Sequence, residues 1–378
     1  MDIIGKNAIL MHNAEHNIPQ MEPWFDEHET SAILDYMQSG GWVTEFTKTR
    51  EFEKLIADYT GAKYCSVVSN GTVSLFLALV ACGVGPGDEV IVPDYTMVAS
   101  ANAVKLAGAE VIFTDIEPTS LCLNLAQIKK AISPRTKAVM LVTINGRYPD
   151  DLEQIVTFCR DKGFKLIEDA AQSLGSRKSG RHLGTFGDIG SFSFAMPKVI
   201  TTGQGGALVT NDEALIEKIR KLRDFGREKP GADHYLTMGW NFKFTDLQAV
   251  IGIEQMKKLP WRVERKKAIY ALYEKQLKDI SEIKFVPTNL TDTSPMFIDI
   301  LVPAEKQKAL VAYLQEKGIG ARLFYPALHA EPVYRKQGSY PVTEDMTQQG
   351  LWLPSSSKLT DGQIKMVCEA IRTFFTLR

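Results

Sequence analysis

Lys198 and Asp169 are the two residues whose types and positions point most directly to chemistry. Lys198 lies between an apolar strand pattern, Phe192–Phe194, and a glycine-rich bend, and Asp169 ends the apolar run that begins at Leu166. Lysine is seldom fully buried in proteins, so an amine in this setting calls for a function. An amine and a carboxylate at two strand ends suit pyridoxal phosphate, because the amine forms a Schiff base with the cofactor and the carboxylate keeps the pyridine nitrogen protonated. The sequence therefore predicts pyridoxal phosphate as cofactor.

Two groups of small residues could hold the phosphate of that cofactor. The segment Ser69–Ser74 joins a predicted strand end to a predicted helix start, where free backbone N–H groups and the helix dipole favour an anion. Gly71 allows the backbone to approach the phosphate closely, and Thr72 or the serine at position 74 can add a hydroxyl to its binding site. Ser193 points away from its two phenylalanine neighbours and could face the same phosphate. The alternatives are an ordinary helix cap by the two residues before Gly71, and a small buried hydroxyl at Ser193.

The adjacent acids Glu168 and Asp169 cannot both face this site, because side chains alternate along a strand. We favour Asp169, because ligands of open α/β sheets bind at the carboxyl ends of the strands. For either acid, the alternative is a solvated strand end.

Other candidate residues carry weaker signals. His329 is the one histidine in an aromatic loop, Phe324–His329, and an ordinary loop histidine is its alternative. Thr245 is a helix-cap signal, and spacing alone gives no binding role to Asn241. The sequence contains no metal-ligand spacing, no Ser-His-Asp arrangement and no GxGxxG after a strand. We therefore expect no metal site.

The composition restricts the class of protein. The chain has 378 residues, of which 44% are hydrophobic and 24% charged, and its net charge is −1. No basic excess points to nucleic acid, and no apolar run reaches the roughly 18 residues of a membrane span. The cysteines number 5 and form no CxxC pair, which favours a reducing compartment. Residues 1–20 lack the pattern of a signal peptide, so we expect a cytoplasmic enzyme. The cluster Arg177, Lys178 and Arg181 is expected to be a solvated turn rather than a phosphate patch.

Strand and helix patterns alternate through the first two-thirds of the chain, which predicts an α/β fold with a mainly parallel sheet between helices. Two separate helices are predicted after it, over 245–256 and 261–277. A smaller α+β domain is predicted from about residue 258, so the expected domains are 1–257, which binds the cofactor, and 258–378. The predicted strands of the first domain are 64–69, 89–93, 111–114, 137–143, 164–168, 192–194 and 206–210.

Taken together, these motifs resemble the DegT/DnrJ/EryC1/StrS family of sugar aminotransferases, which are pyridoxal-phosphate enzymes with the aspartate aminotransferase fold (fold type I). The resemblance runs from about Ile18 to the C-terminus. It rests on these ordered stretches: Ser69–Thr72, Gly85–Pro93, Glu168–Gln172, Gly184–Asp188, Phe192–Lys198, Ile200–Gly206 and Asn241–Gln248.

The resemblance implies roles around the cofactor ring. Lys198 would form the Schiff base with the cofactor and move protons to and from substrate carbons. Asp169 would pair with the pyridine nitrogen, and Gln172 would contact the ring hydroxyl. Family members that dehydrate their substrate carry histidine at the lysine position, so the lysine found here disfavours that branch.

The resemblance also implies how the phosphate is held. Gly71, Thr72 and Ser193 would bind it within one subunit. Asn241 would reach the phosphate of the neighbouring subunit's cofactor. A homodimer with shared active sites is therefore expected.

Two positions depart from the family pattern. Met97 stands where many members stack an aromatic residue on the cofactor, and a thioether can pack against the ring face with a different interaction. Arg147 follows Thr-Ile-Asn-Gly where many members read His-Leu-Tyr-Gly. We expect Arg147 either to bind an acidic group of the substrate or to pair at the surface with Asp150 or Asp151.

The loop 324–335 is expected to contribute to substrate choice. Tyr325 and His329 are its candidate side chains, although spacing assigns no role to either.

The leading hypothesis is transfer of an amino group from an amino acid such as L-glutamate to a keto sugar. The usual family substrate is a nucleotide-linked 4-keto-6-deoxy sugar, used in polysaccharide or lipopolysaccharide assembly. The alternatives are an acidic keto sugar such as 8-oxo-3-deoxy-octulosonate, a pyridoxal-phosphate sugar dehydratase or other lyase, and a regulator that kept the fold without catalysis.

Overall fold

A computed structural model describes residues 17–376 of the chain. Its centre is a seven-stranded sheet. The strands follow one another across the sheet in the order β1 (Tyr64–Val68), β9 (Gly206–Thr210), β8 (Ile189–Ser193), β5 (Lys165–Asp169), β4 (Thr136–Val142), β2 (Glu89–Pro93) and β3 (Glu110–Thr114). The strands from β8 to β3 pair in parallel, whereas β9 runs antiparallel to both of its neighbours. The predicted α/β class and mainly parallel sheet are confirmed.

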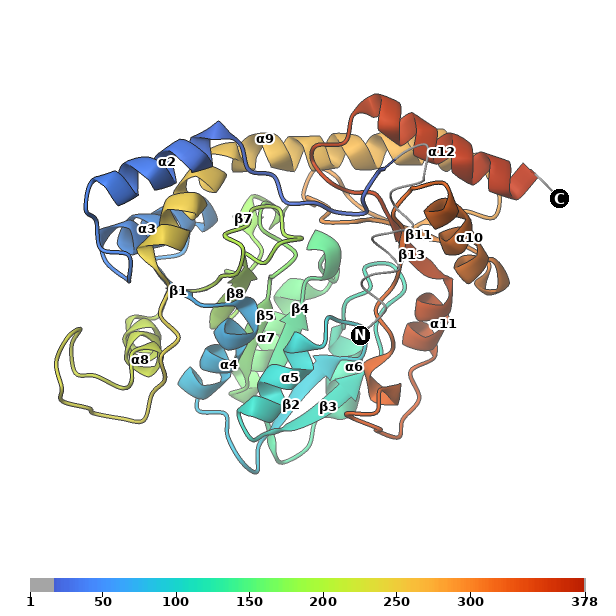
Figure 1. Cartoon of the computed structure of the whole chain (residues 1–378). Coiled ribbons are helices and arrows are strands. Elements are labelled where there is room, and N and C mark those ends of the chain that lie inside the picture. Colours follow the sequence, from blue (N-terminus) through green and yellow to red (C-terminus); the bar gives the residue numbers. More distant parts are fainter. Residues whose placement is uncertain (1–16, 377–378) are drawn as a thin grey trace.

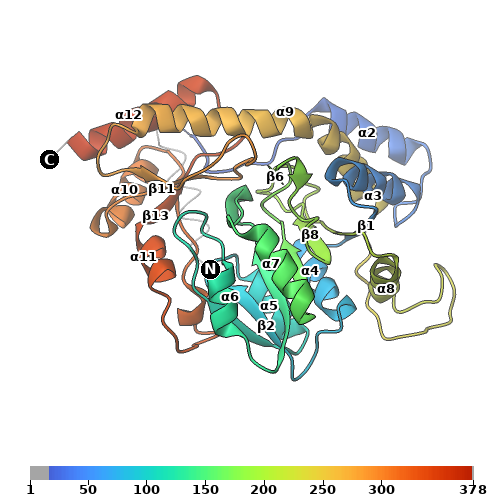
Figure 2. The ribbon, with the colours of Figure 1, turned by 180° about the vertical axis from the view of Figure 1, so that it is seen from behind.

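Helices cover both faces of this sheet, as Figures 1 and 2 show from opposite sides. The apolar side chains of β2 explain why helices pack on both faces of the sheet. Val90 and Val92 contact the core beneath α4 (Gly71–Ala81) and α5 (Ala99–Leu106), while Ile91 contacts the core beneath α6 (Leu125–Ala131) and α7 (Leu152–Lys162). A strand that is apolar at every position is therefore buried on both faces.

The outer strands β1, β8 and β9 pack against a third group of helices. This group consists of α3 (Thr47–Thr60) and the first half of α9 (Asp246–Leu277). Helix α2 (Glu27–Gln38) lies on α9, and helix α8 (Glu213–Arg223) lies beside β1 and α4. The short hairpin β6 (Arg177–Lys178) and β7 (Arg181–His182) carries the basic cluster. Lys178 pairs with Glu153 at 3.0 Å, and Arg177 and Arg181 donate to the carbonyls of Tyr59 and Thr185, which agrees with a turn rather than a phosphate patch.

The two helices predicted over 245–256 and 261–277 form one helix, α9, which spans the top of the molecule in Figure 1. Thr245 caps it with a reciprocal bond to Gln248, as its cap signal predicted. The proline at its middle, Pro260, costs one backbone hydrogen bond but does not end the helix, because Leu259 and Val263 on either side are buried in the core.

The C-terminal third forms a smaller α+β unit. Its antiparallel sheet has the order β10 (Lys284–Phe285), β11 (Ile298–Leu301), β13 (Gly350–Leu353) and β12 (Arg322–Leu323). The helices α10 (Ala304–Glu316), α11 (Pro341–Gln349) and α12 (Asp361–Thr376) and the second half of α9 complete it. Neither β13 nor α11 was predicted.

The predicted division between residues 257 and 258 differs from the structure in two ways. It falls inside α9, which belongs to both units. In addition, Ile18 pairs with Ile319 and lies in the core of the smaller unit, so the first described residues join that unit rather than the cofactor-binding domain. The prediction about a signal peptide concerns residues 1–20, most of which lie outside the described residues. Within 17–376, no helix combines the length and apolar character that crossing a bilayer requires.

Candidate active site

Lys198 lies in the loop that joins β8 to β9, and its side chain is partly buried. Its backbone N–H donates to Ala195 at 3.1 Å, which closes a turn around the lysine. Burial lowers the pKa of the Lys198 amine to about 8, while the negative charge of Asp169 acts in the opposite direction. An amine with this pKa is partly neutral near neutral pH, which is the form that attacks a carbonyl and accepts a proton.

Asp169 is the last residue of β5, its side chain is buried, and it lies close enough to Lys198 for the two charges to act on each other. The hydroxyl of Ser100 donates to its Oδ2 at 2.7 Å, and the backbone N–H of Ala171 donates to Oδ1 at 3.2 Å. Burial raises the pKa of Asp169, whereas these hydrogen bonds and the Lys198 charge lower it. The hydroxyl of Thr96 lies 2.9 Å from that of Ser100 and continues the network.

Glu168 turns to the other side of the sheet, as strand alternation predicted. Its carboxylate accepts from the backbone N–H groups of Gly184 at 2.7 Å, Phe186 at 2.5 Å and Gly187 at 2.6 Å. It therefore holds the loop before β8, and Asp169 is the acid that lies near the lysine.

The anion cup was predicted at the turn between β1 and α4. The side chain of Asn70 accepts from Val73 at 2.9 Å and caps the helix. Across residues 17–376, no protein acceptor is found for the N–H groups of Gly71 and Thr72, which precede Val73. A methyl group at Gly71 would lie 2.8 Å from the Cβ of Ser193, so this glycine and Ser193 form one cradle. The helix cap at Asn70 thus leaves two backbone N–H groups of the same turn for the anion that the sequence predicts here.

Ser74 does not take part in this cup. Its hydroxyl lies 2.7 Å from that of Ser191 and donates to Ala207 at 2.9 Å, and its side chain is fully buried. The sequence left open whether Thr72 or Ser74 supplies a hydroxyl to the cup, and only the hydroxyl of Thr72 remains available.

Gln172 and Tyr325 are brought together from the two units of the fold. The Oε1 of Gln172 accepts from the backbone N–H of Asn145 at 2.8 Å. Burial raises the pKa of Tyr325 to about 12, and the charge of Arg322 and a hydrogen bond from Gln172 oppose that shift. Tyr325 follows β12 in the smaller unit, so this contact joins that unit to the segment after β5.

Met97 and Asn241 are both open to solvent. The Met97 side chain is 43% exposed on the connection between β2 and α5. Asn241 pairs through its backbone with Asp224, and its side chain is exposed. Within the described part of the chain, no polar contact joins Asn241 to the group around Lys198, and its expected role toward a neighbouring subunit stays a prediction.

Arg147 is not where either of its predicted roles would place it. Its side chain is 3% exposed, and its Nη2 bonds both carboxylate oxygens of Asp299 in β11, at 2.6 and 2.7 Å. Its Nε donates to Thr288 at 3.0 Å. The predicted pairing with Asp150 or Asp151 is wrong, because Asp299 compensates the charge from a position 152 residues away in sequence. The charge is therefore not free for an acidic substrate.

His329 is fixed rather than free in its loop. Its Nδ1 lies 2.6 Å from the carboxylate of Asp94 at the end of β2, and its ring stacks on Tyr340 with centroids 4.4 Å apart. Burial raises the pKa of Asp94, while the hydrogen bonds from His329 lower it. Its role in substrate binding remains a prediction.

Sequence reasoning missed several residues that build this site. Ser100, Asn145 and Asp299 bond Asp169, Gln172 and Arg147, and Gln255 and Arg262 of α9 bond the backbone just after Lys198. Only Ser100 carried a signal, a hydroxyl in the first turn of the helix after β2; the others act through contacts between distant segments. In the described residues, no group of His, Cys, Asp and Glu side chains is arranged to hold a metal ion.

The residues fit pyridoxal phosphate by their chemistry. The cradle of Gly71 and Ser193 leaves room for an oxyanion where a side chain would clash, and it has two free N–H donors. Asp169 offers a buried carboxylate to a pyridinium, and the partly neutral Lys198 amine can form an imine.

Comparison with known proteins agrees with this geometry. The DegT/DnrJ/EryC1/StrS aminotransferase family matches residues 23–372. The chain is 34% identical over 361 residues to GDP-perosamine synthase of Escherichia coli O157:H7, covering 95% of this chain and 99% of that one. It is 33% identical over 365 residues to dTDP-4-dehydro-2,3,6-trideoxy-D-glucose 4-aminotransferase of Saccharopolyspora spinosa, covering 92% and 94%.

A solved structure, the aminotransferase TlmJ from Streptoalloteichus hindustanus, is similar to this chain with a TM-score of 0.91 and 31% identity, covering 96% of this chain and all of that one. The predicted fold type and aminotransferase activity are thereby confirmed, and the family implies pyridoxal phosphate. From the whole-length match and the site geometry together, this chain belongs to the DegT/DnrJ/EryC1/StrS aminotransferase family.

Proposed function

We propose that this protein binds pyridoxal phosphate and transfers an amino group from L-glutamate to a nucleotide-linked 4-keto-6-deoxy sugar for polysaccharide synthesis. The observation that carries the proposal is the partly buried Lys198 amine, whose pKa burial lowers to about 8 while the charge of Asp169 acts against that shift. Two of the relatives have names that specify nucleotide-linked sugars, which supports this substrate class. An acidic keto sugar is not favoured, since Asp299 already neutralises Arg147.

Each residue of the site has a distinct task in this reaction. When bound, pyridoxal phosphate supplies an electron sink for the carbon that loses a proton. Asp169 would hold the pyridine nitrogen, and Gln172 would direct its amide toward the ring hydroxyl. Lys198 would take the α-proton from glutamate and return a proton to the sugar carbon. Its pKa of about 8 suits both transfers, because the amine exists in both protonation states near neutral pH.

Gly71, Thr72 and Ser193 would hold the phosphate through two backbone N–H groups and two hydroxyls. Met97 would lie on the exposed face of the ring, where its thioether gives van der Waals contact in place of aromatic stacking. Tyr325 and His329 would contact the sugar from the side of the smaller unit.

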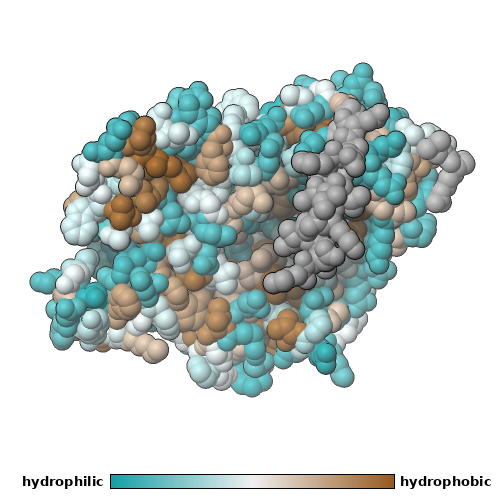
Figure 3. Space-filling view, in the orientation of Figure 1, coloured by the Kyte–Doolittle hydropathy of each residue, from teal (hydrophilic) through white to brown (hydrophobic). Residues whose placement is uncertain are grey.

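A homodimer is part of the proposal. Large apolar side chains are exposed on and around α2 and α3, namely Leu34, Met37, Trp42, Val43 and Phe46, and Figure 3 shows this brown patch at the upper left. Exposed apolar areas of this kind mark protein contacts. The exposed Asn241 would complete the site of the second subunit. The five cysteines are all free thiols, which fits a cytoplasmic location.

The direct test incubates the purified protein with L-glutamate and GDP- or dTDP-linked 4-keto-6-deoxy sugars, with an acidic keto sugar as comparison. The expected result is one 2-oxoglutarate formed for each amino sugar, both measured by mass spectrometry. Lys198→Ala should abolish both products. A sugar product without nitrogen would indicate a lyase, and no product from any keto sugar would overturn the proposal.

A further inference from the structure

The loop that carries Lys198 is held from outside by two buried side chains of α9. The Nη1 of Arg262 donates to the carbonyl of Val199 at 2.9 Å, one residue after the lysine. The Oε1 of Gln255 accepts from the backbone N–H of Thr201 at 3.3 Å. Arg262 is 2% exposed and Gln255 is fully buried. Both side chains therefore fix the backbone on the C-terminal side of Lys198.

The remaining polar contacts of this loop are mostly internal. Lys198 bonds back to Ala195, and Thr202 bonds back to Phe194 at 3.0 Å. Among the described residues, two other side chains outside the loop bond its backbone between Ala195 and Gly205. Ser193 at the end of β8 accepts from Ala195 at 3.4 Å, and Gln248, which also belongs to α9, donates to Gln204 at 2.7 Å. Apart from β-strand neighbours, α9 thus supplies the polar anchors of the lysine loop.

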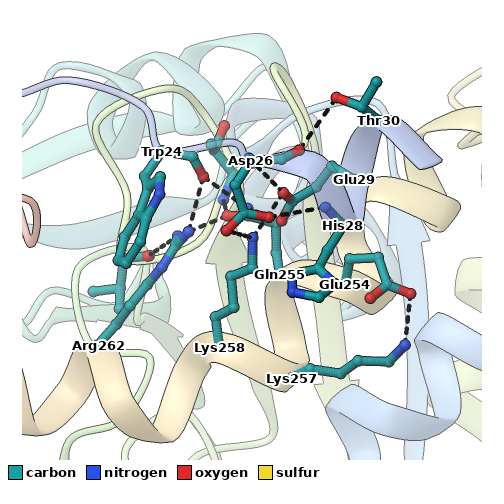
Figure 4. Close-up of polar contacts among 12 residues, drawn as sticks. Trp24, Asp26, His28, Glu29, Thr30, Glu254, Gln255, Lys257, Lys258 and Arg262 are labelled. Carbon is teal, nitrogen blue, oxygen red and sulfur yellow. Dashed lines mark hydrogen bonds and ion pairs between the residues drawn. The ribbon is translucent and has the colours of Figure 1, made fainter. Parts of the chain in front are cut away.

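Arg262 and Gln255 are themselves oriented from the side of α2, as Figure 4 shows. The carbonyl of Trp24 accepts from Arg262 and from Gln255, each at 2.9 Å. The Nε2 of Gln255 also donates to the carboxylate of Glu29 at 2.6 Å, and Lys258 bonds the other oxygen of Glu29 at 2.7 Å. Because a carboxylate accepts and does not donate, Glu29 fixes which end of the Gln255 amide faces the loop.

Only an arginine meets the geometry at position 262. Its Nη1 serves the carbonyl of Val199 and the Oε1 of Gln255, at 2.9 and 2.7 Å, while its Nη2 serves Trp24. The planar guanidinium holds these donors in a fixed fork, whereas a lysine ammonium is a single point that cannot span the same acceptors.

We infer that Arg262 and Gln255 are positioning residues for the reaction of Lys198: they connect α2 to the lysine loop and keep the amine aimed at the space between Asp169 and the α4 cup. The inference rests on the proposed function for its catalytic consequence. Neither residue touches the reacting atoms, so both act through the backbone of residues 199–201. A misplacement of about 1 Å is enough to lower a rate by roughly 100-fold.

The test compares Arg262→Gln and Arg262→Lys with Arg265→Gln. Arg265 also lies on α9 and bonds Asp361 at 2.9 Å, away from the lysine loop, so it is a matched control. The first readout is hydrogen exchange of the peptide 195–206 in the cofactor-free protein. The second is the pH dependence of Lys198 acetylation, measured by mass spectrometry against the exposed Lys54 as internal reference.

Both Arg262 variants should exchange the 195–206 peptide about tenfold faster or more, since hydrogen bonds to a charged group are lost. Lys198 should become less reactive below pH 8, because a looser loop admits water, which raises the pKa of the amine and leaves less of it neutral. With substrates, kcat should fall roughly 10- to 100-fold while the KM for glutamate changes less than about threefold. Arg265→Gln should match the wild type in all three measurements.

Unchanged exchange and acetylation in Arg262→Lys would overturn the inference, as would faster exchange spread over the whole chain. If Arg262→Gln does not fold, Gln255→Glu serves as the second variant, because it keeps an acceptor for Thr201 but loses the donors to Trp24 and Glu29. Exchange and acetylation need no keto sugar. They decide the inference even if the wild-type protein aminates no sugar, a result that would count against the proposed function alone.

Discussion

At the scale of single residues, the site depends on how burial changes two charges. Burial lowers the pKa of the Lys198 amine to about 8 and raises the pKa of the Asp169 carboxyl, so each group is less firmly charged than in water. The attraction between the two charges limits both shifts. A pyridinium ring placed between them would give Asp169 a permanent partner and leave Lys198 free to exchange protons.

Arg147 and Asp299 are a second buried pair of charges, and these two neutralise each other in the interior. We predict that Arg147→Met lowers the free energy of unfolding by about 3–5 kcal/mol, because it leaves Asp299 buried without its partner. The double variant with Asp299→Asn should recover part of this loss. Denaturant unfolding of the three proteins measures both effects.

The kinetic constants provide the control for this prediction. If Arg147 serves only the fold, the KM for the keto sugar should change less than about threefold in the Arg147→Met protein that remains folded. A KM increase of about 100-fold with little loss of stability would instead return Arg147 to the substrate site.

At the scale of secondary-structure elements, the turn from β1 into α4 makes the sharpest prediction. Gly71→Ala would bring a methyl group to 2.8 Å from the Cβ of Ser193 and 3.0 Å from its Oγ. The two elements must then separate where the phosphate would lie. We expect the affinity for pyridoxal phosphate to fall about tenfold or more, measured by titrating the cofactor-free protein.

Gly85→Ala is the control for that measurement. Gly85 has no atom within 4 Å of an added methyl group and lies outside the site. Equal affinity of the Gly71→Ala protein and the wild type would show that the phosphate binds elsewhere.

Individual strands and helices show how far the sequence could predict the structure. Strands β2 and β9 begin and end at the predicted residues, because glycine, proline or polar residues bracket continuous apolar runs there. Strand β13 escaped prediction, since its four residues, Gly350–Leu353, are too few to distinguish a strand from a loop. Two helices were predicted over 245–256 and 261–277, whereas α9 is continuous, because burial on both sides of Pro260 outweighs the local preference of proline.

In the candidate site, too, the sequence predicted local patterns but not contacts between distant segments. Lys198, Asp169 and the cup at Gly71 could be proposed because each belongs to a local pattern of strand, turn and helix. The partners of Arg147 and of the backbone at Val199 could not, because Asp299 and Arg262 reach them from distant segments. Their pairing depends on how β11 and α9 cross the large domain, which no local spacing records.

At the scale of the whole molecule, the exposed apolar patch on α2 and α3 predicts the assembly. Trp42 is 67% exposed, so Trp42→Glu should leave the subunit folded but place a charge in the subunit contact. We expect the dimer to dissociate at concentrations at least tenfold higher than for the wild type, as measured by analytical ultracentrifugation.

Val333→Glu is the matched control, because Val333 is 69% exposed on the loop before α11, away from the patch. This variant should assemble like the wild type. A Trp42→Glu protein that keeps the wild-type dimer would place the subunit contact on another surface.

The pH dependence of global stability should depend on Lys266, a residue outside the site. This lysine is 2% exposed within α9, and its ammonium donates to the carbonyls of Met296, at 2.6 Å, and Ser355. Burial, assisted by the charge of Arg262, lowers its pKa to about 7. In the unfolded chain, a lysine has a pKa of about 10.4.

Between these two pKa values, the unfolded state binds more protons than the folded state, so the free energy of unfolding rises with pH. Below about pH 7 the amine is protonated in both states, and the cost of burying the charge is present in full. One such group contributes a slope of up to about 1.4 kcal/mol per pH unit. Lys266→Met should therefore flatten the rise in stability between pH 7 and 9, whatever its effect at a single pH.

Chemical denaturation at several pH values measures this slope. The control is Lys267→Met, which removes the next lysine of α9, whose ammonium pairs with Glu264 at 3.2 Å near the surface. This control should keep the wild-type slope. An identical slope for Lys266→Met and the wild type would mean that the buried ammonium keeps its proton throughout this range, with the two carbonyls stabilising the charge as well as water does.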